Sequence, residues 1–365
     1  MPRFWHGMAL GPWFRLLARN RFRVGPTRLP MALIISGCSA ASTVGAWQEK
    51  LVYGRLLRKA RERRDPLFVI GHWRTGTTFM HELLVQDPRF TFPTTYQVSA
   101  PHHFLSSSWC IRPLLKFLLP KRRVMDNMAF GGDTPQEDEF ALCTMGVPSP
   151  YVNMAWPNLN QRCDGSLELD PLDPDDAAAW KAGMRYFLSK LALKDRRRVV
   201  LKSPTHTARV ATLLDMFPKA RFVHLVRNPY RTFRSTLHMW KTMQAVCGLQ
   251  VPRYEHLEDY LFDMYERMYY CFERDRGAID SDCICDVKYE DLVNDPIGEL
   301  ARVYQHLGLE GFDKENPRLR EYVNSKKGYR TNVLSLDARL RERIADRWSD
   351  YFDRYGYSKD IAEAI

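Results

Sequence analysis

The chain has 365 residues, a formal net charge of +11, 45% hydrophobic residues and 27% charged residues. With 19 Phe, 17 Tyr and 9 Trp it has enough apolar area for a sizeable core, which excludes collagen-like, low-complexity and wholly disordered chains. Residues 1–64 hold 13 Lys and Arg against two Glu, so the remainder is neutral and the charge does not indicate nucleic-acid binding.

The amino-terminal segment, residues 1–64, has basic ends around an uncharged stretch at residues 29–48, where Leu33, Ile34 and Trp47 alternate with Ser and Gly. Aromatic residues among the arginines favour an interfacial anchor on an anionic membrane surface. A helical hairpin packed on the main body or on a partner subunit, and a single membrane-spanning helix, are the alternatives. The eight Cys lack metal-type spacing and the chain has no Asn-x-Ser/Thr site, which favours the cytoplasmic face of a membrane.

Residues 65–365 are predicted to form one α/β domain. Short apolar runs predict strands at residues 67–70, 199–202, 222–226 and 283–287. Helical periodicity predicts helices from about residue 76 to 86, around residues 210–217, and at residues 230–240 and 256–274. This alternation predicts a three-layer domain with a mainly parallel sheet, flanking helices and a site at the carboxyl ends of the strands. Between residues 90 and 198 the pattern loosens into Pro-rich loops and short helices, which predicts a lid or acceptor-binding insertion.

A candidate phosphate loop follows the first predicted strand. Residues 71–78, Gly-His-Trp-Arg-Thr-Gly-Thr-Thr, match the first six positions of GxxxxGK[ST] and lead into a helix. Thr77 stands where a triphosphate-binding loop has its lysine, and Arg74 is the nearby cation. The loop therefore predicts a nucleotide phosphate ligand and disfavours a triphosphate with bound magnesium.

The loop resembles the 5′-phosphosulfate loop of sulfotransferases that use 3′-phosphoadenosine 5′-phosphosulfate. The residues that carry this similarity are Arg74, Thr75, Gly76, Thr77, Thr78 and Phe79, the last standing where many relatives have an adenine-stacking Trp. Arg227 and Ser235 have the spacing of the family's 3′-phosphate pair. Tyr289 lies in a Tyr-Glu-Asp-Leu segment similar to the one near the adenine, and Lys326, Lys327 and Gly328 resemble the late basic loop at the 3′-phosphate. The resemblance covers about residues 66–332.

The resemblance implies a P-loop NTPase-like sulfotransferase fold. It also implies sulfuryl transfer from the phosphosulfate donor to a hydroxyl acceptor, with release of adenosine 3′,5′-bisphosphate and no required metal. Arg74 and Lys202 are expected to neutralise the leaving group. A lipid acceptor is favoured by the amino terminus, and a glycan or a small phenol is the alternative. An ATP-dependent kinase-like enzyme and an inactive membrane-bound binding protein of this fold are the other interpretations.

Two residues are candidates for the base that takes the acceptor proton. Cytosolic sulfotransferases carry a catalytic His two residues after the lysine, whereas His206 follows Lys202 by four, in the predicted first turn of a helix. The alternative is Glu137. Tyrosylprotein and heparan sulfate sulfotransferases use a Glu soon after the first helix, where this chain has residues 94–97, Thr-Thr-Tyr-Gln. His102, His103 and Trp109 are expected near the acceptor.

Overall fold

The computed structural model describes residues 3–60, 65–123, 125, 128–159, 165–169, 173–326 and 336–360. The chain divides into two compact units. The first unit comprises Met1–Arg64, Thr91–Arg198 and Trp240–Glu255, and the second comprises Asp65–Phe90, Val199–Met239 and His256–Ile365. The basic amino-terminal segment therefore belongs to the same unit as the insertion at residues 91–198.

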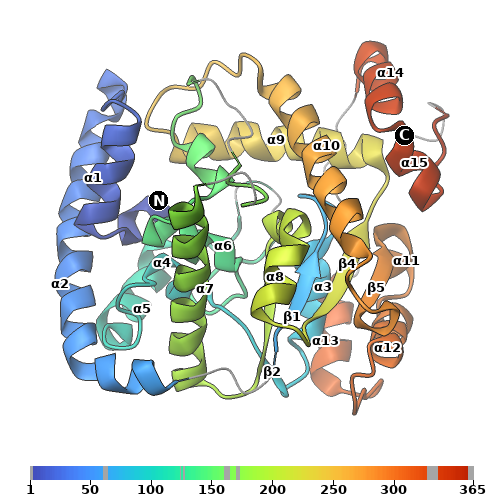
Figure 1. Cartoon of the computed structure of the whole chain (residues 1–365), viewed down its shortest axis with the longest axis horizontal. Coiled ribbons are helices and arrows are strands. Elements are labelled where there is room, and N and C mark those ends of the chain that lie inside the picture. Colours follow the sequence, from blue (N-terminus) through green and yellow to red (C-terminus); the bar gives the residue numbers. More distant parts are fainter. Residues whose placement is uncertain are drawn as a thin grey trace. The chain divides into compact units, whose positions relative to one another are not determined.

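A five-stranded sheet with the order β2-β3-β1-β4-β5 organises the second unit. The strands are β1 (Leu67–Ile70), β2 (Phe90–Thr91), β3 (Arg198–Lys202), β4 (Arg221–Val226) and β5 (Ile284–Lys288). β1 pairs in parallel with β3 and β4, and β4 pairs in parallel with β5 (Figure 1). These strands are apolar runs because helices cover both faces of a parallel sheet. The predicted parallel α/β sheet is confirmed, and β2 is an additional strand that its two residues do not signal.

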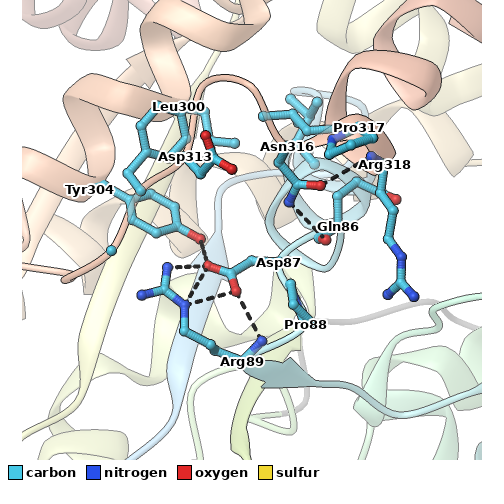
Figure 2. A pocket seen from close by; sticks show the side chains of 14 residues that line it. Gln86, Asp87, Pro88, Arg89, Leu300, Tyr304, Asp313, Asn316, Pro317 and Arg318 are labelled. Carbon is cyan, nitrogen blue, oxygen red and sulfur yellow. Dashed lines mark hydrogen bonds and ion pairs between the residues drawn. The ribbon is translucent and has the colours of Figure 1, made fainter.

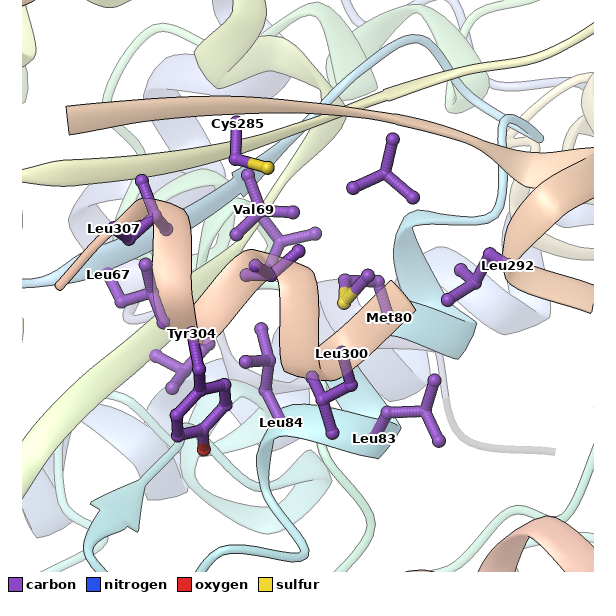
Figure 3. Close-up of a cluster of buried hydrophobic side chains, with 14 of the residues drawn as sticks. Leu67, Val69, Met80, Leu83, Leu84, Cys285, Leu292, Leu300, Tyr304 and Leu307 are labelled. Atoms are coloured by element: carbon purple, nitrogen blue, oxygen red, sulfur yellow. The ribbon is translucent and has the colours of Figure 1, made fainter. Parts of the chain in front are cut away.

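Helices cover the two faces of this sheet. Those of the second unit are α3 (Thr77–Leu84), α8 (Val210–Met216), α10 (Leu257–Arg276), α11 (Tyr289–Asn294), α12 (Pro296–His306), α13 (Pro317–Lys326), α14 (Ala338–Arg347) and α15 (Ser349–Tyr355), while α9 (Pro229–Cys247) carries residues of both units. On one face, Leu67 and Val69 of β1 join a buried cluster with α3 and α12 (Figure 3). Phe68, between them, stacks instead on Phe222 at 5.5 Å between ring centroids. Alternate residues of β1 thus point to opposite faces of the sheet.

The carboxyl-terminal helices α14 and α15 pack on α10. Trp348 stacks on Tyr265, with 3.5 Å between the ring centroids. Arg347 pairs with Glu266 at 2.6 Å, and Arg343 pairs with Asp259 at 2.5 Å. This segment, which follows the region of family resemblance, is therefore an integral part of the second unit.

The first unit is helical. Its elements include α1 (Leu10–Arg19), α2 (Leu29–Lys59), α4 (Thr95–Ser99), α5 (Ser108–Leu118), α6 (Asp138–Met145) and α7 (Pro174–Lys194). α7 has 21 residues, so the prediction of only short helices in the insertion was wrong. Its amino terminus is capped by Asp173, whose side chain accepts a hydrogen bond from Asp175 N, and Trp180, Met184, Phe187 and Leu191 form its buried stripe.

α2 stays helical through its Ser- and Gly-rich middle. Ser39 is fully buried, and a Cβ at Gly45 would lie 2.8 Å from the ring of His103. The Thr43 hydroxyl donates to the Ser39 carbonyl at 2.8 Å, which satisfies it inside the helix. The small residues therefore mark a packing face and not a break.

α2 is fastened to the rest of its unit by a buried ion pair. The side chains of Glu49 and Lys190 have no exposed surface and contact each other. Glu49 Oε2 also accepts from the amide nitrogens of Leu105 (2.7 Å) and Ser106 (3.2 Å). Since α1 contacts the same helix through Trp13 Nε1 and the Ser36 hydroxyl at 2.9 Å, α1 and α2 form a hairpin packed within the first unit.

Candidate active site

The phosphate loop joins β1 to α3. Gly71 and Gly76 have φ values of +131° and +99°, which side chains with a Cβ rarely adopt. A Cβ at Gly76 would also overlap the ring of Tyr289. The amide of Gly71 donates to the Thr207 hydroxyl at 2.7 Å. The loop therefore needs both glycines, and its geometry agrees with an anion-binding turn at a helix amino terminus.

Arg74 occupies the centre of this loop. Its φ of +70° is uncommon for a residue other than glycine. Two contacts hold it: Nε donates to the Ser235 hydroxyl at 2.9 Å, and the backbone carbonyl accepts from Arg227 Nη1 at 2.8 Å. The structure thus brings together three residues that the sequence assigns to the donor phosphates.

Arg227 lies just after the carboxyl end of β4 and is 7% exposed. Its guanidinium lies over the Tyr289 ring at 4.1 Å from the centroid. Burial lowers the pKa of Arg227 from its ordinary value, and within the described part of the chain its Nε has no hydrogen-bond partner. A buried cation with an unused N–H is stabilised by an anion, so this environment suits a phosphate group.

The sequence analysis missed the contribution of Tyr351 to this site. The Tyr351 hydroxyl, on α15, accepts from the backbone N–H of Arg227 at 3.2 Å. No local pattern signals this contact, because it joins residues 124 positions apart in the chain.

Lys202 and the threonines of α3 lie at the same end of the sheet. Lys202 is the last residue of β3, is 1% exposed and pairs in register with Val69, two residues before Gly71. Thr77 and Thr78 are the first two residues of α3. Lys202 is thus positioned beside the strand that leads into the loop.

The remaining predicted donor residues lie along α3 and α13. Phe79 is half-buried and faces Tyr322, with 6.3 Å between ring centroids. Lys326 pairs with Glu82 at 3.3 Å. Lys327 and Gly328 lie outside the described residues, so Lys326 is the described member of the predicted basic loop.

His206 is in a 3₁₀ helix (Pro204–Arg209) that precedes α8, and not in the first turn of the α-helix. Its side chain has no exposed surface. The imidazole packs edge-on against Phe68 of β1, with 5.5 Å between ring centroids. His206 is therefore buried on the face of the sheet to which Phe68 points.

Glu137 belongs to the first unit and is the N-cap residue of α6. Backbone hydrogen bonds pair the segment before it with residues 93–96: Tyr96 N donates to Gly132 O at 2.8 Å, and Gln136 N donates to Pro93 O at 2.9 Å. The half-buried Glu137 carboxylate accepts from the Tyr151 hydroxyl. Glu137 is distant in sequence from residues 94–97, the region where other sulfotransferases carry the Glu that acts as base. The segment before Glu137 is nevertheless paired with that region.

His102 and His103, the two histidines of the insertion, are largely buried within the first unit. Burial, followed by the charge of Lys190, lowers the pKa of His102 and of His103 to about 4 each. His103 Nδ1 lies 2.7 Å from the Ser107 hydroxyl. Both imidazoles are therefore neutral at pH 7. Trp109 is 80% exposed on α5.

A cavity of about 460 Å³ lies beyond the carboxyl end of α3, between the turn that follows this helix and α12 and α13. Figure 2 shows hydrogen bonds among residues that line it: Asp87 accepts from Tyr304 at 2.7 Å and from Arg89 Nε at 2.9 Å, and Asn316 donates to Gln86 O at 3.3 Å. Since the phosphate loop precedes the amino terminus of α3, this cavity is separate from the donor residues.

Comparison with known proteins finds several sulfotransferases that resemble this chain. The chain is 41% identical over 360 residues to the omega-hydroxy-beta-dihydromenaquinone-9 sulfotransferase Stf3 of Mycobacterium bovis, which covers 98% of this chain and 92% of the relative. It is 25% identical over 344 residues to carbohydrate sulfotransferase 4 of Mus musculus, covering 84% and 82% of the two chains. The structure of sulfotransferase STF9 from Mycobacterium avium has the same fold, with a TM-score of 0.71 at 18% identity and coverage of 96% and 97%. Residues 66–314 match the sulfotransferase family model, and the chain therefore belongs to the sulfotransferase family.

Proposed function

We propose that this sulfotransferase transfers the sulfuryl group of 3′-phosphoadenosine 5′-phosphosulfate to a lipid hydroxyl at an anionic membrane surface. The observation that carries the donor assignment is Arg227, a buried guanidinium with an unused N–H beside the phosphate loop. The loop lacks the lysine that a nucleoside triphosphate requires. Family membership also favours sulfuryl transfer over the ATP-dependent alternative.

The residues have distinct roles in this reaction. The acceptor oxygen attacks sulfur, the bond from sulfur to the 5′-phosphate oxygen breaks, and adenosine 3′,5′-bisphosphate leaves with the bonding electrons. Arg74 and Lys202 neutralise the charge that develops on the leaving group, while Arg227 and Ser235 hold the 3′-phosphate. We assign the proton of the acceptor hydroxyl to Glu137, whose carboxylate accepts a hydrogen bond from the Tyr151 hydroxyl, and His206 is the alternative base.

A lipid is the acceptor class that the relatives favour. The 41% identical relative is named for a menaquinone derivative that carries a terminal hydroxyl. The carbohydrate sulfotransferase is more distant, at 25% identity. We therefore propose a long-chain lipid with a free hydroxyl, and a glycan is the alternative.

Transfer of radiolabelled sulfate tests this function. With the full-length protein and ³⁵S-labelled donor, we expect label to enter the organic phase of a membrane lipid extract, including in the presence of EDTA. Label confined to a glycan fraction would replace the lipid acceptor with the alternative. Transfer that stops in EDTA would contradict the absence of a metal requirement.

Arg227→Ala is expected to weaken binding of adenosine 3′,5′-bisphosphate by roughly 10-fold to 100-fold, because a charge-assisted contact to phosphate is lost. Binding of adenosine 5′-monophosphate, which lacks the 3′-phosphate, should change little. Isothermal titration calorimetry of both ligands measures the difference, with Ser235→Ala as the milder variant. Equal losses for both nucleotides would refute the 3′-phosphate assignment.

The exposed side of α2 supports the membrane assignment. Leu33, Val44, Trp47 and Leu51 share one helix face and are 57–73% exposed. The segment Pro26–Lys59 is long and apolar enough to span a bilayer by length and composition alone. The opposite side of α2, however, packs within the first unit through Glu49. We therefore propose that α2 lies along the membrane surface, on its cytoplasmic face, and does not cross it.

Trp47→Gln and Leu51→Gln together should lower binding to anionic vesicles by at least tenfold, because each removes an exposed apolar side chain from the proposed contact. Co-sedimentation of the full-length protein with phosphatidylglycerol-containing vesicles measures it, and binding should weaken as salt rises. Tyr270→Gln, at a residue 70% exposed in the second unit, is the matched control. Wild-type protein that leaves vesicles only in detergent would indicate an inserted helix.

A further inference from the structure

Helix α5 presents a second apolar face to solvent in the first unit. Trp109 and Phe117 are 80% and 87% exposed, and Leu114 and Leu118 are each 48% exposed. Because residues four apart share a helix face, the exposed residues form two adjacent columns: Trp109, Pro113 and Phe117 in one, and Cys110, Leu114 and Leu118 in the other. Leu115 is the buried residue of this helix. Large aromatic side chains in such an exposed patch indicate a contact surface.

Positive charge lies beside this face. Arg112 and Lys116 are spaced four apart on the next column of α5, and Lys121 and Arg122 follow the helix. Asp133 pairs with Arg112 at 2.7 Å, but residues 89–125 contain no Asp or Glu. An apolar, aromatic face bordered by cations is typical of helices that lie in the interface of an anionic membrane.

The start of α5 is tied to α2. The Glu49 carboxylate of α2 accepts hydrogen bonds from the amides of Leu105 and Ser106, which precede α5 by only a few residues. Both helices belong to the first unit. α5 also lies within residues 90–198, the insertion predicted to bind the acceptor. A bilayer contact through α5 would therefore involve the region expected to receive a lipid.

We propose that α5 docks on an anionic lipid bilayer, with Trp109 and Phe117 inserted among the headgroups and the cations of residues 116–122 against the lipid phosphates. This inference rests on the membrane association proposed above and extends it to a contact outside residues 1–64. It assigns to the insertion the task of holding the acceptor site against the bilayer that supplies the lipid.

The experiment measures vesicle binding of full-length variants. Trp109→Ala combined with Phe117→Ala should lower the partition coefficient for phosphatidylglycerol-containing vesicles by on the order of tenfold per side chain. Trp109→Phe should retain most of the binding, because it keeps an aromatic ring at the interface. Tyr270→Ala with Val293→Ala, at residues 70% and 52% exposed in the second unit, is the matched control and should bind as wild type does. Brominated lipids should quench wild-type fluorescence more than that of Trp109→Phe.

The outcomes separate this inference from the proposed function. If the α5 variant and the control bind vesicles equally while the Trp47 and Leu51 substitutions reduce binding, α5 is not a docking element but the α2 anchor stands. If wild type never binds vesicles, both membrane proposals fail, whereas sulfuryl transfer is tested separately in detergent. Unchanged affinity of the α5 variant for adenosine 3′,5′-bisphosphate would show that its loss of binding is not unfolding.

Discussion

Replacing Glu137 with Gln is expected to lower the turnover number by roughly 10²-fold to 10⁴-fold, the usual contribution of a general base. The Gln side chain keeps the size and the hydrogen-bond acceptor that the Tyr151 hydroxyl contacts, but it cannot take a proton. The affinity for adenosine 3′,5′-bisphosphate should stay within twofold, because Glu137 is not among the donor-binding residues. Single-turnover transfer from labelled donor to a hydroxylated lipid in detergent measures the chemical step directly.

Two further variants decide between the candidate bases. His206→Asn should leave the turnover of the folded enzyme within a few-fold, because Glu137 is the proposed base. Its expected effect is on stability, which thermal unfolding measures. Tyr151→Phe should reduce turnover less than Glu137→Gln, since Tyr151 only orients the carboxylate. A large loss of turnover in His206→Asn with normal activity in Glu137→Gln would return the role to His206.

Sequence patterns located β1, β3, β4 and β5 because most residues of these strands are buried. The predicted strand at residues 67–70 coincides with β1 (Leu67–Ile70), and the run at residues 222–226 falls within β4 (Arg221–Val226). In such a strand most side chains are apolar, so a short run stands out from the polar loops around it. The phosphate loop was located for a related reason, since Gly71 and Gly76 adopt positive φ values that favour glycine.

The helices of the first unit were harder to predict, because their signals depend on tertiary contacts. Ser39 and Gly45 lie in the stretch where Ser and Gly alternate with apolar residues, and the structure uses their small size for close packing. In the sequence, Glu49 is one of two acidic residues in a basic segment. Its partner Lys190 is 141 residues away, so no local pattern indicates the pair. The exposed face of α5 was equally hidden, because Trp109 and Phe117 have the composition of a core helix and only the fold shows that they face outward.

The buried pair of Glu49 and Lys190 is expected to dominate the stability of the first unit. Lys190→Met leaves a carboxylate without its cation, and Glu49→Gln leaves an ammonium without its anion. Each single substitution should lower the free energy of unfolding by about 3–5 kcal/mol, the usual cost of breaking a buried pair. The double variant should recover most of that loss, because Gln still accepts from the amides of Leu105 and Ser106 and no charge stays buried. Urea unfolding of all four proteins gives the coupling energy.

The pH dependence of the unfolding free energy of these variants also tests whether Lys190 is paired with Glu49. Burial lowers the pKa of Lys190 from 10.5 to about 8, even though Glu49 favours the charged form. Between these values the unfolded chain binds more protons than the folded one, so this group adds stability as pH rises. Without Glu49 the pKa of Lys190 falls further, so Glu49→Gln gains stability from a lower pH than the wild type and its deficit should shrink as pH approaches 8, while the deficit of Lys190→Met should grow above pH 8. If α2 left the first unit to cross a bilayer, neither substitution would change unfolding in detergent, and this result would restore the spanning alternative.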